Sequence, residues 1–236
     1  MGEYRTMKID DSSNIGPYSG EYTIMVSSSV GGFETQLNLI YAYLTQLGLN
    51  VVMSCEGTLK VNPKIGSFNS CLNAVENCDM FLGIIRQNCG SGNAGSCSIT
   101  FEEFKHAKEK GKPCWYIIEE EVKTARMLLM NVLELREHPK TYSKCFNKCA
   151  SIFYDRTIRR RKKLPKVMQM FKPDKTHTFD EECFAMEDFV NQKDKKNRME
   201  VSDNWMQYID CKNWFEIERF LKTNFADKPF IDSIMK

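Results

Sequence analysis

Four short apolar segments alternate with three amphipathic segments in the first half of the chain, and this alternation constrains the fold most. The apolar segments, which are typical of buried strands, are 22–26, 51–53, 80–85 and 114–118. The amphipathic segments, which are typical of helices, are 33–47, 68–77 and 100–110. Because right-handed crossovers leave few other arrangements, this order predicts an α/β fold, a parallel sheet with helices on both faces.

The second half of the chain differs in charge and pattern. Residues 1–121 carry 9 basic and 14 acidic side chains, whereas residues 122–236 carry 24 and 17. The second half holds charged helical stretches and no clear strand alternation. The helices expected there are 122–137, a basic helix within 142–164, and 213–224, with a solvated linker at 191–204. We therefore predict an α/β domain over 1–121 and a mainly helical C-terminal extension over 122–236.

Composition excludes several classes of protein. Hydrophobic residues make up 42% and charged residues 27%, which are ordinary values for a globular protein. The net charge of +2 argues against a dedicated nucleic-acid binder. The 10 cysteines form no CxxC pair, and Cys145 and Cys149 have no second pair at zinc spacing, so we expect free thiols in a reducing compartment and no metal site. With neither a signal peptide nor a long apolar segment, the chain is expected to be cytoplasmic.

Ligands of doubly wound sheets bind at the carboxyl ends of the strands, and three segments should meet there. They are the Ser/Gly-rich corner Ser27 to Phe33, the glycine-rich loop Arg86 to Ser98, and the helix start Thr100 to Glu103. Serine hydroxyls could bond ribose hydroxyls, and backbone N–H groups in both loops could hold a phosphate. GSGNAG at 90–95 follows the third strand and is not a dinucleotide fingerprint, and no GxxxxGK[ST], HExxH or GxSxG occurs.

Glu103 is the candidate catalytic group. In the first turn of a helix its carboxylate would be stabilised by the helix dipole, and it would point into the crevice. A fixed anion there suits the oxocarbenium-like cation formed when an N-glycosidic bond breaks. The alternative is a capping box, Thr100-x-x-Glu103, in which Glu103 only bonds back to the cap residue. Glu102 is expected to be solvated and His106 to be an exposed helix residue, although a general-base role for His106 is conceivable.

Four segments together resemble the TIR-like superfamily, which includes bacterial defence domains and nucleoside 2-deoxyribosyltransferases. The segments are 24–30, 71–85, 98–113 and 114–118, and they are most similar to a bacterial TIR-like family of unknown function. The shared motifs are Ser27-Ser28, Cys78-Asp79, Gly90, Ser98/Thr100/Glu103 and Gly111-Lys112-Pro113. The resemblance spans about residues 22–120 and implies a flavodoxin-like sheet. Asp79 precedes its strand, so we interpret it as a structural turn residue.

The resemblance implies an NAD-consuming enzyme that cleaves the nicotinamide–ribose bond, a hydrolase or a cyclase making an ADP-ribose-type signal. It implies Glu103 as the catalytic glutamate, NAD as substrate rather than cofactor, a homo-oligomer, and anti-phage defence with a downstream effector protein. The family usually carries Asp-Arg-Tyr-Gly where this chain has Gln87 to Gly90, so the arginine and the tyrosine are missing there, and Arg86 could substitute for the arginine or not. The candidate substrate-binding residues are Ser27, Ser28, Ser29, Phe33, Arg86, Asn88, Gly90, Ser98 and Thr100.

Two other functions remain open. A nucleoside 2-deoxyribosyltransferase or hydrolase would use the same glutamate and release free base from deoxynucleosides. A non-catalytic TIR-like interaction module would use Glu103 only as a helix cap. The basic run 156–163 could bind nucleic acid or an acidic partner, although a solvated helix face is favoured.

Overall fold

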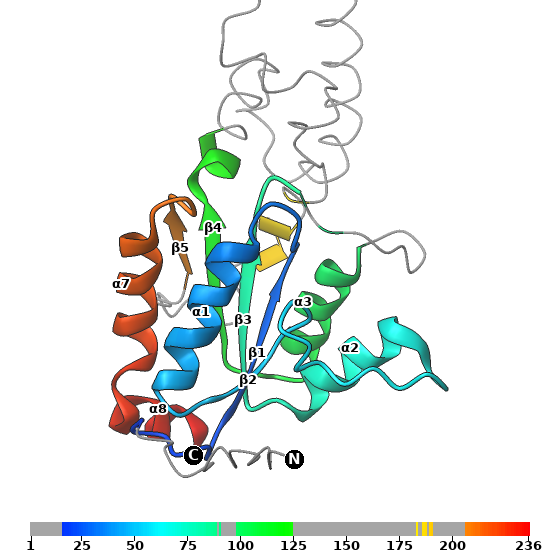
Figure 1. The fold of residues 1–236 in the computed structure, drawn as a ribbon, viewed down its shortest axis with the longest axis horizontal. Helices are drawn as coiled ribbons and strands as arrows, with labels where there is room; N and C mark the ends of the chain where they lie inside the picture. The colour runs from blue at the N-terminus through cyan, green and yellow to red at the C-terminus, as the bar shows by residue number, and fades with distance from the viewer. Residues whose placement is uncertain are drawn as a thin grey trace, which may run out of the picture.

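The computed structural model describes residues 16–88, 90, 98–124, 183, 186–187, 189–190 and 206–236. Within them five strands form one sheet in the order β2-β1-β3-β4-β5 (Figure 1). The strands are β1 (Thr23–Ser28), β2 (Asn50–Val52), β3 (Met80–Ile85), β4 (Cys114–Glu119) and β5 (Met206–Ile209). Every neighbouring pair is parallel. The predicted α/β class is confirmed, and this strand order is that of flavodoxin-like folds.

Helices cover both faces of the sheet (Figure 1). Helices α1 (Glu34–Gln46), α7 (Trp214–Phe225) and α8 (Lys228–Met235) pack on one face, in a core cluster that holds Leu82 and Ile84. Helices α2 (Gly66–Asn77) and α3 (Ile99–Glu109) pack on the other face, in a cluster that holds Phe81 and Ile85. All six residues of β3 are buried, which confirms that both faces of this strand are covered.

The fifth strand is the one element of the sheet that the sequence analysis missed. β5 pairs with β4 from Tyr116–Met206 to Glu119–Ile209. Only the last of its four residues is fully buried, so it shows neither an apolar run nor a clear alternation. The second half of the chain, which we predict to be mainly helical, therefore contains a strand, although its sequence shows no clear strand alternation.

The end of the chain belongs to the same core as the beginning. The predicted helix 213–224 is confirmed as α7, whose Ile217, Phe220 and Phe225 are buried in the cluster on that face. The division of the chain into domains at residue 121 stays a prediction. Residues 120–124 are helical, while the other predicted helical stretches and the basic run 156–163 lie outside the described residues.

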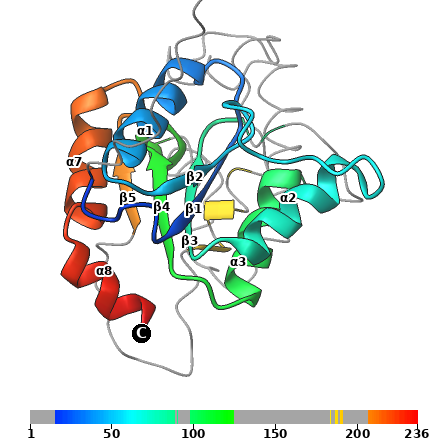
Figure 2. The same ribbon diagram turned by 60° about the horizontal axis from the view of Figure 1, so that its bottom comes forward.

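The amino ends of the strands meet at one edge of the sheet, called here the amino edge, which Figure 2 turns toward the viewer. There the backbone N–H of Thr23 donates to the Asp79 carboxylate at 2.7 Å, so Asp79 is a structural turn residue as predicted. The Lys112 Nζ donates to the carbonyl oxygens of Glu76 at 2.8 Å and Cys78 at 2.5 Å, at the end of α2. The Tyr18 hydroxyl donates to the Phe225 carbonyl oxygen at 2.5 Å.

No disulfide joins the cysteines that the structure describes. They are Cys55, Cys71, Cys78, Cys114, Cys183 and Cys211, and each is buried or half-buried. Cys145 and Cys149 lie outside the described residues. None of the helices in the described ranges has both the length and the apolar character that a membrane span requires.

Candidate functional site

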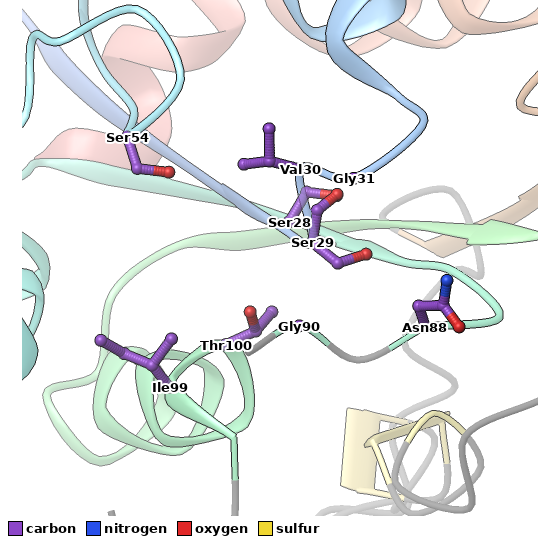
Figure 3. A pocket seen from close by; sticks show the side chains of 9 residues that line it. All are labelled: Ser28, Ser29, Val30, Gly31, Ser54, Asn88, Gly90, Ile99 and Thr100. Atoms are coloured by element: carbon purple, nitrogen blue, oxygen red, sulfur yellow. The ribbon is translucent and has the colours of Figure 1, made fainter. Parts of the chain in front are cut away.

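A pocket of about 440 Å³ lies at the opposite edge of the sheet, the carboxyl edge. It lies beside the ends of β1 and β3, the point at which the chain switches sides in the strand order and at which such folds bind ligands. Figure 3 shows the turn after β1 on one side and the start of α3 with Gly90 on the other. The lining residues are Ser28, Ser29, Val30, Gly31, Ser54, Asn88, Gly90, Ile99 and Thr100.

The structure brings five of the predicted substrate-binding residues together around this pocket, namely Ser28, Ser29, Asn88, Gly90 and Thr100. They come from three segments that are far apart in the sequence. The wall from Ser28 to Gly31 is the turn that follows β1, and it closes when the Phe33 N–H donates to the Val30 carbonyl at 2.9 Å. The prediction that the carboxyl ends of the strands place these segments side by side is confirmed.

Gly90 allows the loop after β3 to pass close to α3. Its φ of +99° lies in the left-handed region that favours glycine, and a Cβ there would lie 2.9 Å from the Thr100 hydroxyl oxygen. A side chain at this position would therefore push on the pocket wall. This is the close backbone approach that a glycine-rich loop at a ligand site permits.

Arg86 and Phe33 support the wall of the pocket and do not line it. The Arg86 Nη1 donates to the carbonyl oxygens of Ser29 at 3.4 Å and Gly31 at 3.2 Å. The guanidinium lies 4.3 Å from the centroid of the Phe33 ring. Both side chains are buried, so their predicted role as direct substrate contacts is not what the geometry shows. The physical reason is that the turn after β1 folds over the arginine and supplies its acceptors.

Glu103 does not cap α3, so the capping-box alternative is wrong. The N-cap is Ser98, whose side chain accepts from the Phe101 N–H at 3.3 Å. Because α3 begins at Ile99, Glu103 is its fifth residue and lies beyond the first turn, and Glu102 is the acidic residue of that turn. The predicted first-turn position of Glu103 at the positive end of the dipole is therefore also wrong.

Glu103 is instead buried between three elements. Its carboxylate accepts a hydrogen bond from the Ser27 hydroxyl of β1 and is hydrogen-bonded to the Cys71 thiol of α2. Only 6% of Glu103 is exposed, and burial raises the pKa of the carboxyl group while these two hydrogen bonds oppose the rise. Burial likewise raises the pKa of the Cys71 thiol to about 12. Neither Glu103 nor Ser27 lines the pocket, but Thr100, one turn before Glu103, does.

The other ionisable groups of α3 face away from this site. Glu102 pairs with Lys105 at 2.8 Å. His106 lies 3.1 Å from Glu76 of α2 and only 20% of its side chain is exposed, so it is partly buried rather than exposed as predicted. Among residues that the structure describes, no group of His, Cys, Asp and Glu side chains is arranged to hold a metal ion.

Ser54, Ile99 and Glu119 belong to this edge but were not singled out from the sequence. Ser54 follows β2, so the rule that ligands bind where parallel strands end would have found it. Glu119 ends β4 and accepts from the Gln87 N–H at 3.0 Å, and burial raises the pKa of its carboxyl group. Glu119 supports the backbone just after β3, and nothing in the sequence pattern distinguishes it from its two neighbouring glutamates.

Comparison with known proteins gives a family but no activity. No curated protein matches the chain, and no solved structure does. The model of one domain family matches residues 23–201, which include four of the five strands and every residue that lines the pocket. Because this match covers more than half of the chain, the protein belongs to the family described as Domain of unknown function (DUF4062).

Proposed function

We propose that the chain binds a ribose-containing nucleotide of the NAD class at the pocket and cleaves its N-glycosidic bond. The observation that carries this proposal is the position of Glu103. Its carboxylate is held by the Ser27 hydroxyl at the end of β1, one helical turn from the pocket-lining Thr100. A buried carboxylate this close to a ligand pocket is suited to stabilise a developing cation, because a low-dielectric surrounding strengthens the interaction.

In the proposed reaction the bond between C1′ and the nicotinamide nitrogen breaks, and its electron pair goes to the nicotinamide ring. The resulting ribosyl cation is stabilised by ionised Glu103. Water then adds to C1′ and releases a proton, or an internal nucleophile closes a cyclic product. Because Glu103 lies behind the lining residues, we assign it electrostatic stabilisation rather than attack on C1′. Burial raises the pKa of the Glu103 carboxyl group, and the hydrogen bonds from Ser27 and Cys71 act against this larger effect and favour the ionised carboxylate that the role requires.

The wider biological role belongs to the same proposal. By the resemblance of segments 24–30 and 98–113, the chain would be a TIR-like enzyme of anti-phage defence, which depletes NAD or makes a nucleotide signal for an effector protein. Self-association would complete the active form. Deoxynucleosides are the alternative substrates.

The test compares two neighbouring glutamates. The purified full chain, at concentrations that allow self-association, is incubated with NAD and separately with deoxynucleosides, and the products are resolved by mass. We expect nicotinamide release that falls at least about 100-fold in Glu103→Gln. Glu102→Gln is the matched control, because Glu102 sits on the same helix but pairs with Lys105 in partial exposure. If Glu103→Gln released nicotinamide as fast as Glu102→Gln, Glu103 would have no part in the reaction.

A second function, non-catalytic nucleotide binding, is favoured by one observation. Glu103 is 6% exposed and hydrogen-bonded on both sides, as a structural core carboxylate would be. In that case the wild-type chain would bind NAD and release no nicotinamide at any concentration. Binding without turnover therefore distinguishes the second function from the first.

A further inference from the structure

The part of the pocket wall that the structure describes is polar but uncharged. Its described lining residues supply four hydroxyl groups, from Ser28, Ser29, Ser54 and Thr100, and one amide, from Asn88. No lysine, arginine, aspartate or glutamate is among them. The sequence from 87 to 98, between β3 and α3, also contains no charged residue. Phosphate sites ordinarily combine backbone N–H groups with a cationic side chain, and the second component is missing from this lining.

Three groups beside the described part of the pocket could bind a phosphate, and each is engaged at least in part. At the start of α3, the Ser98 hydroxyl accepts from the Phe101 N–H at 3.3 Å. At the start of α1, the Gly32 N–H donates to the Glu34 carboxylate at 3.2 Å. Backbone hydrogen bonds to Glu34, including this one, hold the pKa of its carboxyl group below the ordinary value. A phosphate at this helix start would have to replace a carboxylate and would be repelled by its charge. Arg86, the nearby cation, donates its Nη1 to the carbonyls of Ser29 and Gly31, and its Nε has no partner among the described residues.

One pocket hydroxyl is buried and unsatisfied. Ser29 is 6% exposed, and its hydroxyl oxygen has no hydrogen-bond partner among the described residues. Its neighbour Ser28 donates to the Ser29 carbonyl at 3.1 Å, so that hydroxyl is engaged. An unpartnered buried hydroxyl is costly, and native structures retain such groups rarely. A ligand hydroxyl within reach would satisfy it, as both donor and acceptor.

We infer that the pocket takes the uncharged ribose end of its ligand, with a ribose hydroxyl bonded to Ser29 and any phosphate left outside. The ligand class is thus a riboside, recognised through its sugar hydroxyls. A volume of about 440 Å³ is in the range of pockets for small molecules of this size. The inference rests on the proposed function in one respect, that the ligand carries ribose.

The test uses a ligand pair that the proposed reaction cannot cleave. Benzamide riboside has a carbon–carbon glycosidic bond, and its 5′-monophosphate differs only in the phosphate. Titration calorimetry on the full chain is expected to give dissociation constants that agree within about threefold. Excess inorganic phosphate is expected to leave riboside binding unchanged. A monophosphate that binds more than about tenfold tighter, or competition by phosphate, would overturn the inference.

A serine variant tests the named contact. Ser29→Ala is expected to weaken riboside binding by about tenfold, the effect of one lost hydrogen bond. Ser233→Ala is the control, because the Ser233 hydroxyl is on α8 and donates to the Phe230 carbonyl, remote from the pocket. Thermal unfolding of both variants checks that they are folded. Unchanged affinity in folded Ser29→Ala contradicts the assignment, as does the absence of riboside binding to the wild-type chain.

The outcomes separate this inference from the proposed function. If the riboside binds and no N-glycosidic bond is ever cleaved, the inference holds and the proposed reaction is wrong. If NAD is cleaved and the riboside pair binds only through its phosphate, the reaction holds and the inference is wrong.

Discussion

The two edges of the sheet differ in how fully their buried polar groups are paired. At the amino edge, Asp79 accepts from Thr23, Lys112 donates to the end of α2, and Tyr18 donates to Phe225. At the carboxyl edge, the Ser29 hydroxyl and the Arg86 Nε are buried without partners among the described residues. Buried polar groups that pair with each other stabilise a fold, whereas unpaired ones lower its stability. The amino edge therefore holds the chain together, and the carboxyl edge keeps unpaired groups that suit a ligand.

The largest expected effect is on stability at the amino edge. Gly48 has a φ of +85°, and a Cβ there would lie 2.6 Å from the backbone nitrogen of Ser19. Gly48→Ala should lower the free energy of unfolding by about 2 kcal/mol or more, since it adds a backbone clash to left-handed strain. Gly57→Ala is the control for strain alone, because Gly57 has a φ of +67° and open space around it. Chemical denaturation should show a clearly smaller loss for Gly57→Ala, and equal losses would mean that the clash relaxes freely.

Lys112 offers the next test of the same edge. Lys112→Met removes the donor to the carbonyl oxygens of Glu76 and Cys78, and should lower the free energy of unfolding by about 1 to 2 kcal/mol. Ligand affinity should not change. Lys60→Met, at an exposed position, should stay within about 0.5 kcal/mol of the wild-type chain. If Lys112→Met kept full stability but bound the ligand more weakly, the assignment of stability to the amino edge and ligand binding to the carboxyl edge would be wrong.

The pH dependence of stability should have opposite signs at the two edges. Burial raises the pKa of Glu103, so the folded chain holds this proton more tightly, and its contribution to stability falls as pH rises through the raised value. Hydrogen bonds from Lys110 and His106 lower the pKa of Glu76, so its contribution is present at higher pH and is lost as pH falls. Urea denaturation at a series of pH values should show both effects. Glu103→Gln should remove a fall in the free energy of unfolding with rising pH. Glu76→Gln should remove a rise in the free energy of unfolding with rising pH. If both substitutions changed the pH dependence of the free energy of unfolding in the same direction, the result would contradict the burial of Glu103.

The smallest effect concerns two serines of the carboxyl edge. Ser98 caps α3, so Ser98→Ala should lower the free energy of unfolding by about 1 kcal/mol. Ser29→Ala removes a buried hydroxyl with no described partner and should leave stability unchanged or raise it by up to about 1 kcal/mol. Thermal unfolding of the two variants under the same conditions measures both changes in stability. A loss in Ser29→Ala as large as that in Ser98→Ala would show that Ser29 is structural.

Much of the fold follows from local pattern. The segment 80–85 matches β3 to the residue, since a run of six apolar residues between polar ones fits a strand buried on both faces. β5 was not predicted because three of its four residues are only half-buried. They are identified as a strand by their pairing with β4, which the sequence does not show. A strand at the border of a sheet carries little periodicity of its own.

The edge of the sheet at which the pocket lies could be predicted from the sequence, but the contacts of individual side chains there could not. The rule for parallel sheets placed Ser28, Asn88 and Thr100 correctly, because it depends on strand ends alone. The cap of α3 was misjudged because Ser98 and Thr100 are both acceptable caps, and only the tertiary structure chooses between them. The burial of Arg86 could not be predicted from the sequence either, because the carbonyl groups that accept its hydrogen bonds belong to a turn far away in the sequence.

The position of β5, α7 and α8 affects how the chain is made. The core on the α1 face includes Ile209, Phe220 and Ile231, and it surrounds β1 residues such as Ile24, which are translated well before them. While a ribosome is still adding the intervening residues, the exposed edge of β4 has no neighbour and the apolar side of α1 is incompletely covered. A nascent chain that stops at residue 201, where the family match ends, would therefore present both surfaces to chaperones and to other nascent chains.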